Sequence, residues 1–218
     1  MKKSILFIIL LSFGCSSLKL VNNWKDPDTV LFHANKVLIV GMIQNDRVRE
    51  DFENKLKYGF TKRNIEAVRS LDLFDVEFTS SEQSEKELYE VEQQLLNKDF
   101  DAILFTRIMG SENKKTLRSR MSNFERYSGA FKDEYMKNQG TYYEDDLNDN
   151  FTVFHAETAL YCICVDKERQ VIWRTEIDIT NPKNIEKSVE EYINLVLNAM
   201  ENQDLIFHKA NADLSTGL

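Results

Sequence analysis

The chain has 218 residues, of which 42% are hydrophobic and 29% charged, and it contains only seven glycines and two prolines. This balance excludes a disordered, collagen-like or disulfide-scaffold protein, and the length suits one domain with a proper core. The net charge of −8 becomes −10 without the first fourteen residues, which include Lys2 and Lys3. A surface this acidic argues against nucleic acid as a partner, because phosphate binding depends on Lys and Arg.

The first fifteen residues have the organisation of an export signal. A positive start at Lys2 and Lys3 is followed by an unbroken apolar run over residues 5–11, and the small residue Gly14 precedes Cys15. The apolar run is shorter than the roughly 20 residues that a membrane-spanning helix needs. Residues 1–14 are therefore predicted to be a cleavable signal peptide.

This stretch resembles the signal of bacterial lipoproteins, in which a cysteine after a small residue is acylated and becomes the mature amino terminus. It departs from the usual pattern at Ser12, where leucine is common, and at the bulky Phe13. The resemblance implies a diacylglyceryl lipid on Cys15, usually with a third acyl chain, and stable attachment to a membrane needs at least two such chains. Ser16 in place of Asp implies the outer membrane, facing the periplasm. The alternative is an ordinary secretory signal with an incidental cysteine.

Residues 15–35 lack sustained periodicity. They are interpreted as a lipidated amino terminus and tether, or as a tether with a first edge strand around Leu18–Trp24. A fully extended tether of this length would reach at most roughly 65–70 Å.

An α/β domain is predicted over residues 36–206. The continuous apolar run of residues 36–43 is typical of a buried strand. Asn45 or Asp46 can cap a following helix, whose apolar residues recur every fourth position from Val48. A short strand is expected at 65–69, a helix opening with a capping box at Ser84 and Glu87, and a second buried strand at 101–109.

After an excursion over residues 110–150, a strand is predicted at 151–165, a turn at 166–169 and a returning strand at 170–179. A last helix is expected from Asn181 and Pro182, and residues 207–218 form a polar tail. The order β-α-β-α-β, excursion, β-β-α predicts the α/β class, as a single two-layer or three-layer domain with a mixed sheet. This order resembles that of small periplasmic lipoprotein domains such as the amino-terminal domain of the TolB translocation protein, which implies no active-site residues here.

Cys162 and Cys164 are two residues apart and lie on one apolar face of the predicted strand. Zinc needs at least three or four ligands. A disulfide between such residues would span roughly 6.6 Å between Cα atoms, near the upper limit of disulfide geometry. We therefore expect both to be reduced thiols of the core.

Three further patterns in the sequence could indicate a metal site or a catalytic site. Asp146, Asn148, Asn150 and Glu157 fall at the ligand positions of an EF-hand loop, but Phe151 occupies the place that needs glycine, which favours a solvated acidic loop. Ser111 and Lys114 match the Ser-x-x-Lys pattern of acyl-transferring enzymes, as expected by chance in a chain rich in both residues. The three histidines, His33, His155 and His208, are scattered. The sequence thus predicts no catalytic residue, no metal site and no cofactor.

The excursion carries an aromatic stripe at helical spacing, accompanied by basic residues. We interpret it as a candidate contact surface for a partner, since long excursions from a compact layer are often functional. The alternative is an extra helix that packs across the sheet. The candidate residues are Phe124, Tyr127, Phe131, Tyr135, Arg118 and Arg120.

The sequence therefore favours a membrane-tethered lipoprotein of the bacterial envelope, acting as a non-enzymatic binding or assembly accessory. Its expected partners are the membrane, through the lipid anchor, and another envelope protein. Two alternatives remain: a hydrolase or lipid-modifying enzyme with an unrecognised carboxylate site, and a small-ligand sensor. A cavity with convergent titratable groups would favour an enzyme, and a shallow apolar or aromatic patch would favour an interaction module.

Overall fold

The computed structural model describes residues 17–29, 32–74, 78, 81–111, 131–142, 153–163, 170–180, 182 and 184–206. Its centre is a six-stranded mixed sheet in the order β1-β6-β5-β4-β2-β3. β2, β3 and β4 are mutually parallel, and the remaining pairs are antiparallel. The strands are β1 (Leu18–Lys25), β2 (Lys36–Met42), β3 (Glu66–Arg69), β4 (Ala102–Ser111), β5 (Val153–Cys162) and β6 (Val171–Thr180).

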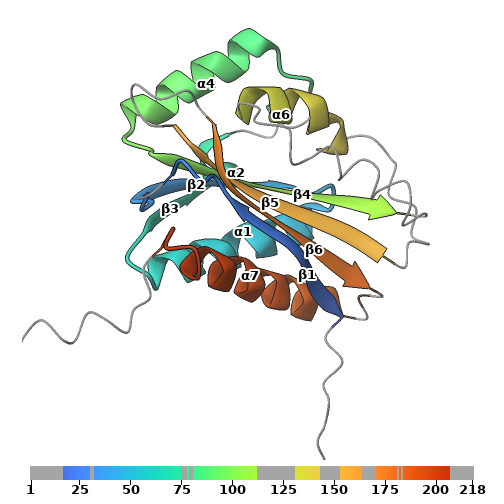
Figure 1. Ribbon diagram of the computed structural model, residues 1–218. Coiled ribbons are helices and arrows are strands. Elements are labelled where there is room, and N and C mark those ends of the chain that lie inside the picture. The colour runs from blue at the N-terminus through green and yellow to red at the C-terminus, as the bar shows by residue number, and fades with distance from the viewer. Residues whose placement is uncertain are drawn as a thin grey trace, which may run out of the picture.

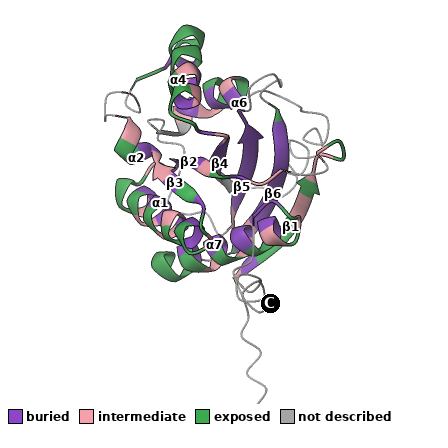
Figure 2. Cartoon of the chain, turned by 90° about the vertical axis from the view of Figure 1, so that its left-hand side faces the viewer, coloured by how far each residue is buried: buried purple, intermediate pink, exposed green. Residues whose placement is uncertain are grey.

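Helices cover both faces of this sheet, which makes three layers (Figure 1). α1 (Asp46–Thr61) and α7 (Ile185–Glu201) lie on one face, and α4 (Glu85–Asn97) and α6 (Phe131–Asn138) lie on the other. The short helix α2 (Ser70–Leu73) follows β3, and a 3-10 turn, η2 (Gln139–Tyr142), follows α6. In Figure 2 the helices turn buried residues toward the sheet and exposed residues outward. The predicted α/β class with a mixed sheet is confirmed.

Two of the predicted helix starts are confirmed by their caps. The Asn45 side chain accepts a hydrogen bond from the backbone N–H of Val48 at the start of α1. Ser84 and Glu87 form the capping box of α4. These side chains satisfy first-turn N–H groups that have no partner within the helix.

α7 begins later than expected. Asn184 is its cap, because the Asn184 side chain accepts from the backbone N–H of Lys187 at 2.9 Å, and the helix starts at Ile185. Pro182 therefore lies before the helix and not in its first turn. Proline is favoured in the first turn of a helix, but here the hydrogen bond accepted by the Asn184 side chain sets the start of α7.

The first strand settles the interpretation of residues 15–35. β1 pairs antiparallel with β6 over its whole length, Leu18 is buried, and the Asn23 side chain accepts from Nε1 of Trp173 at 2.8 Å. Of the two interpretations, the first edge strand is the one that the structure shows, because backbone pairing and a buried leucine hold residues 18–25 in the sheet. In the sequence, two serines separate Cys15 from β1.

The two helices beneath the sheet, α1 and α7, are in close contact near their carboxyl ends. A Cβ added at Gly59 would lie 2.5 Å from Cδ1 of Leu197, so the absence of a side chain lets the helices meet there. Arg63 and Glu201 form an ion pair of 2.6 Å at the same end. The amino-terminal ends of both helices lie near the ends of β4 and β6, where the candidate site is found.

Candidate functional site

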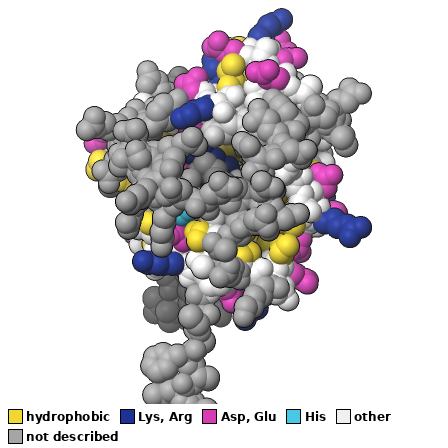
Figure 3. Space-filling model, turned by 90° about the vertical axis from the view of Figure 1, so that its right-hand side faces the viewer, with side chains coloured by type: hydrophobic (Ala, Val, Ile, Leu, Met, Phe, Trp, Pro, Cys, Tyr) yellow, Lys and Arg dark blue, Asp and Glu magenta, His cyan; other side chains and the backbone are white. Residues whose placement is uncertain are grey.

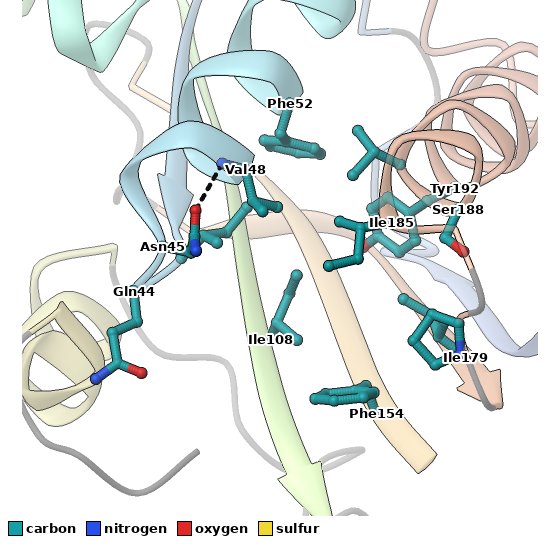
Figure 4. Close-up of a pocket in the computed structure, with 13 residues that line it drawn as sticks. Gln44, Asn45, Val48, Phe52, Ile108, Phe154, Ile179, Ile185, Ser188 and Tyr192 are labelled. Atoms are coloured by element: carbon teal, nitrogen blue, oxygen red, sulfur yellow. Dashed lines mark hydrogen bonds between the residues drawn. The ribbon is translucent and has the colours of Figure 1, made fainter. Parts of the chain in front are cut away.

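A cavity of about 310 Å³ opens between the first turns of α1 and α7 and the sheet, and we call it the α1–α7 cavity. Figure 4 shows Val48 and Phe52 of α1, Ile108 of β4 and Phe154 of β5 arranged around it. The lining residues are Ile43, Gln44, Asn45, Val48, Phe52, Ile108, Phe154, Ile179, Pro182, Ile185, Ser188, Val189 and Tyr192.

The topology explains why this cavity lies at the carboxyl ends of parallel strands. Ile43 follows β2, and Ile108 is near the end of β4, which is paired in parallel with β2. Both strands end at this edge of the sheet, and α1 starts here after β2. Open α/β sheets place their ligands in the crevice at such strand ends. The position of the cavity is therefore that of a binding site.

The lining is apolar and uncharged. Among the described residues it includes no carboxylate, imidazole, amine or guanidinium. The lining includes the phenol group of Tyr192. This side chain is buried, and burial raises the pKa of the phenol far above its usual value. The Tyr192 hydroxyl lies 2.7 Å from the hydroxyl of Thr158, which in turn lies 2.7 Å from that of Thr106. In Figure 3 hydrophobic side chains gather in the lower part of this end of the molecule.

The opposite face of the sheet carries a buried ionic cluster. Arg107 of β4 lies 2.8 Å from an oxygen of Glu157 on β5 and 2.7 Å from an oxygen of Glu134 on α6. Arg174 of β6 lies 3.4 Å from the other Glu157 oxygen. All four side chains are buried. The cluster therefore joins three strands and one helix, and Arg107 holds α6 against the sheet.

Two carboxyl groups of this face have raised pKa values. Burial raises the pKa of Glu157, against the opposing effect of Arg107. Burial and the neighbouring Glu157 charge raise the pKa of Glu176 to about 7. Beside them, Nδ1 of His155 contacts the carboxylate of Asp178. Perturbed carboxyl groups of this kind occur at catalytic sites and also in structural ion-pair networks.

A second buried polar cluster centres on Glu53 of α1, which is fully buried. Its carboxylate accepts from the Gly41 backbone N–H at 3.0 Å and from the Ser70 hydroxyl at 2.6 Å. Arg49 also donates to Ser70 at 3.0 Å. These bonds connect α1, β2 and α2, and a buried carboxylate with this many donors serves to fix their positions.

Neither the cavity nor the two polar clusters was predicted from the sequence. The cavity could have been anticipated from the two parallel strands predicted at 36–43 and 101–109, whose carboxyl ends share an edge. The sequence signal for the ionic cluster was the presence of Arg107, Glu157 and Arg174, charged residues inside otherwise buried strands. Their mutual pairing depends on strand register, which the sequence pattern does not give.

The predicted aromatic contact surface falls only partly on described residues. Phe131 and Tyr135 lie on α6 and are each 3% exposed, so they are core side chains and not surface anchors. The Phe131 ring lies 5.7 Å from that of Phe105 and 5.6 Å from that of Tyr161. For these two residues the alternative of a helix packed across the sheet is correct. Four more members lie outside the described residues: Phe124, Tyr127, Arg118 and Arg120.

Cys15, the expected lipidation site, also lies outside the described residues, as does Cys164. Cys162 lies on the buried face of β5 that was expected. It is disulfide-bonded, so the expectation of a reduced thiol at this position is wrong.

The remaining candidate residues are not brought together. Glu157 is paired with Arg107 and Arg174 on β5, and the other three EF-hand positions lie outside the described residues. His33 lies between β1 and β2, His155 lies on β5, and His208 is not described. Within the described ranges, no group of three or more His, Cys, Asp or Glu side chains is placed to hold a metal ion. In the same part of the chain, no helix has the length and apolar character to cross a membrane.

Comparison with known proteins gives a similarity of fold only. No protein-family model and no curated protein matches the chain. Among solved structures, the PelC dodecamer from Paraburkholderia phytofirmans is similar with a TM-score of 0.43 and 9% sequence identity, over 84% of this chain and 96% of that one. A single-substitution variant of the same protein gives a TM-score of 0.40 and 10% identity over the same shares. Similarity at this level carries no information about function.

Proposed function

We propose that the protein is a lipid-anchored accessory of the bacterial cell envelope that binds an apolar ligand, without catalysis, in the α1–α7 cavity. The observation that carries this proposal is the lining of the cavity. Its described residues supply apolar surface from two helices and the sheet, and no side chain that could act as a general acid or base near neutral pH.

The volume and lining suggest the ligand class. An apolar cavity of about 150 Å³ can hold benzene, so 310 Å³ offers room for about twice as many carbon atoms, roughly a dozen. Ligand cavities typically bury most of the ligand and orient it with a few polar groups. Ser188 and Gln44 are polar members of this lining. A fatty acid or the acyl chain of a lipid fits this description.

The test uses the chain expressed without the predicted signal peptide, residues 1–14, and carrying Cys15→Ser, so that it is not lipidated. Titration with a naturally fluorescent fatty acid, cis-parinaric acid, is expected to give saturable binding with a micromolar Kd. Val48→Trp, which fills the cavity, should weaken binding at least about tenfold, which is about 1.4 kcal/mol. The matched control is Val21→Trp on the exposed edge of β1, which should leave the Kd unchanged.

Absence of saturable binding, or equal Kd values for the two tryptophan variants, would contradict the proposal. Circular dichroism of both variants checks that each is folded.

A second candidate is an enzyme acting at the ionic cluster, and the pKa of Glu176, about 7, is the observation that favours it. Carboxyl groups tuned near the working pH suit general acid–base catalysis. Incubation with ester, glycoside and phospholipid substrates should then give turnover that Glu176→Gln abolishes. Equal background rates for both proteins would reject this candidate.

A further inference from the structure

We propose that, in the anchored protein, one acyl chain of its own amino-terminal lipid occupies the α1–α7 cavity. This inference rests on the proposed function and on lipidation of Cys15, and it names the resident ligand of the cavity.

The start of β1 lies at the edge of the cavity. The backbone carbonyl of Ser17 accepts from the N–H of Thr180 at 2.8 Å, and Leu18 is the pairing partner of Ile179. Ile179 is itself a lining residue. In Figure 1 the beginning of β1 lies beside the end of β6 and the start of α7. The chain therefore enters the domain next to the cavity.

The anchor is within reach of this opening. Cys15 precedes Ser17 by two residues, which span at most about 7 Å when fully extended. The Ser17 backbone is held by its bond to Thr180, so the lipid on Cys15 emerges close to the cavity. A tether of twenty residues would have allowed the lipid to lie far from the domain, but β1 removes that freedom.

Chemistry and linkage both favour the protein's own acyl chain over a free lipid. The described lining is uncharged, which matches a hydrocarbon chain and leaves any anionic headgroup without a charged partner. A ligand joined by a short linker has an effective concentration in the millimolar range. This concentration favours entry of the linked chain over entry of a free lipid that is present below the millimolar range.

Occupation of the cavity would reduce the number of acyl chains that anchor the protein in the membrane. A chain sheltered in the protein does not contribute to bilayer binding, and stable anchoring needs at least two inserted chains. A triacylated protein would therefore keep two chains in the membrane. An external apolar ligand would have to displace the third chain.

The test is photocrosslinking of the intact lipoprotein in its membrane. Cells are fed a fatty acid with a diazirine near its methyl end, which enters the lipid anchor, and the membranes are irradiated. Mass spectrometry of the purified protein should show intramolecular crosslinks from the anchor to residues 43–52 and 184–192, which include lining residues of α1 and α7. Val48→Trp should lose at least about nine-tenths of these crosslinks, whereas Val21→Trp should keep them.

Crosslinks confined to membrane lipids, or unchanged by Val48→Trp, would overturn the inference. The two experiments together distinguish an error in the resident ligand from an error in the proposed function. If the Cys15→Ser chain binds cis-parinaric acid and the anchor does not crosslink, the binding function stands and the resident ligand is wrong. If the Cys15→Ser chain does not bind the fatty acid, the proposed function fails with it.

Discussion

Single residues of the ionic cluster determine how the sheet face beneath α6 responds to pH. Glu157 is held between Arg107 and Arg174, so its charge is partnered despite its burial. Glu176 lies beside Glu157 and Asp178, and its pKa of about 7 reflects burial first and these negative neighbours second. Ionisation of Glu176, which lies beside the ionic cluster, therefore opposes folding near neutral pH.

Glu176→Gln is expected to remove part of the pH dependence of stability. Because the folded-state pKa is about 7 and the ordinary value is 4.5, folding is favoured most below pH 4.5, and this contribution is lost as pH rises through 7. The full shift corresponds to about 3 kcal/mol, and screening by solvent reduces the expected gain of the variant at pH 8 to about 1–2 kcal/mol.

Urea unfolding at pH 5 and pH 8 measures this effect. Glu190→Gln, at an exposed position on α7, is the matched control and should change the free energy of unfolding by less than about 0.5 kcal/mol. A Glu176→Gln variant that is no more stable than the native chain at pH 8 would show that Glu176 ionises there without cost.

At the scale of elements, α6 shows why an aromatic stripe does not by itself identify a contact surface. Phe131 and Tyr135 are four residues apart, as expected for one face of a helix. That face packs on Phe105 of β4 and Tyr161 of β5, and Arg107 pairs with Glu134 of the same helix. α6 is thus fastened to the sheet by aromatic packing and by an ion pair.

Phe131→Ala is therefore expected to cost about 3–5 kcal/mol, because a buried aromatic ring is removed and a void remains. For a chain of this size the melting temperature should fall by more than about 8 °C. Met136→Ala on the exposed side of the same helix is the control and should lower it by no more than about 2 °C. Similar small decreases in both variants, measured by thermal denaturation, would mean that α6 is not docked as described.

At the scale of the whole molecule, the sheet carries different chemistry on its two faces. One face, under α1 and α7, is apolar and contains the cavity at the strand ends. The other face, under α4 and α6, combines a second apolar core with the ionic cluster. β1 is the edge strand, and its first residue, Leu18, lies at the cavity end of the molecule as the pairing partner of Ile179. An anchor at Cys15 would hold this end toward the membrane.

Cys15→Ala is expected to release the protein from the membrane fraction and to abolish labelling with radioactive palmitate, because the acyl chains supply the membrane affinity. Val21→Ala, at an exposed position of β1, is the control and should leave both labelling and fractionation unchanged. Membrane association that persists in Cys15→Ala without label would refute the lipid anchor.

Local signals in the sequence determined the class of the fold and most of its elements. Asn45 and the Ser84–Glu87 capping box marked helix starts that the structure confirms, because caps depend on residues within one turn. Continuous apolar runs identified β2 and β4 for a similarly local reason: strands covered on both faces need apolar side chains on both. The export signal is likewise a short contiguous pattern, and lipidation of Cys15 stays a prediction from it.

Tertiary structure decided the features that depend on residues distant in sequence. β1 is a strand because β6 offers its edge about 155 positions later along the chain. Arg107, Glu134 and Glu157 form one cluster only through the register of β4 with β5 and the docking of α6. The α1–α7 cavity exists because two helices that meet at Gly59 leave space at their other ends, above apolar side chains from three strands. No local pattern encodes these pairings, since each depends on how separate elements pack.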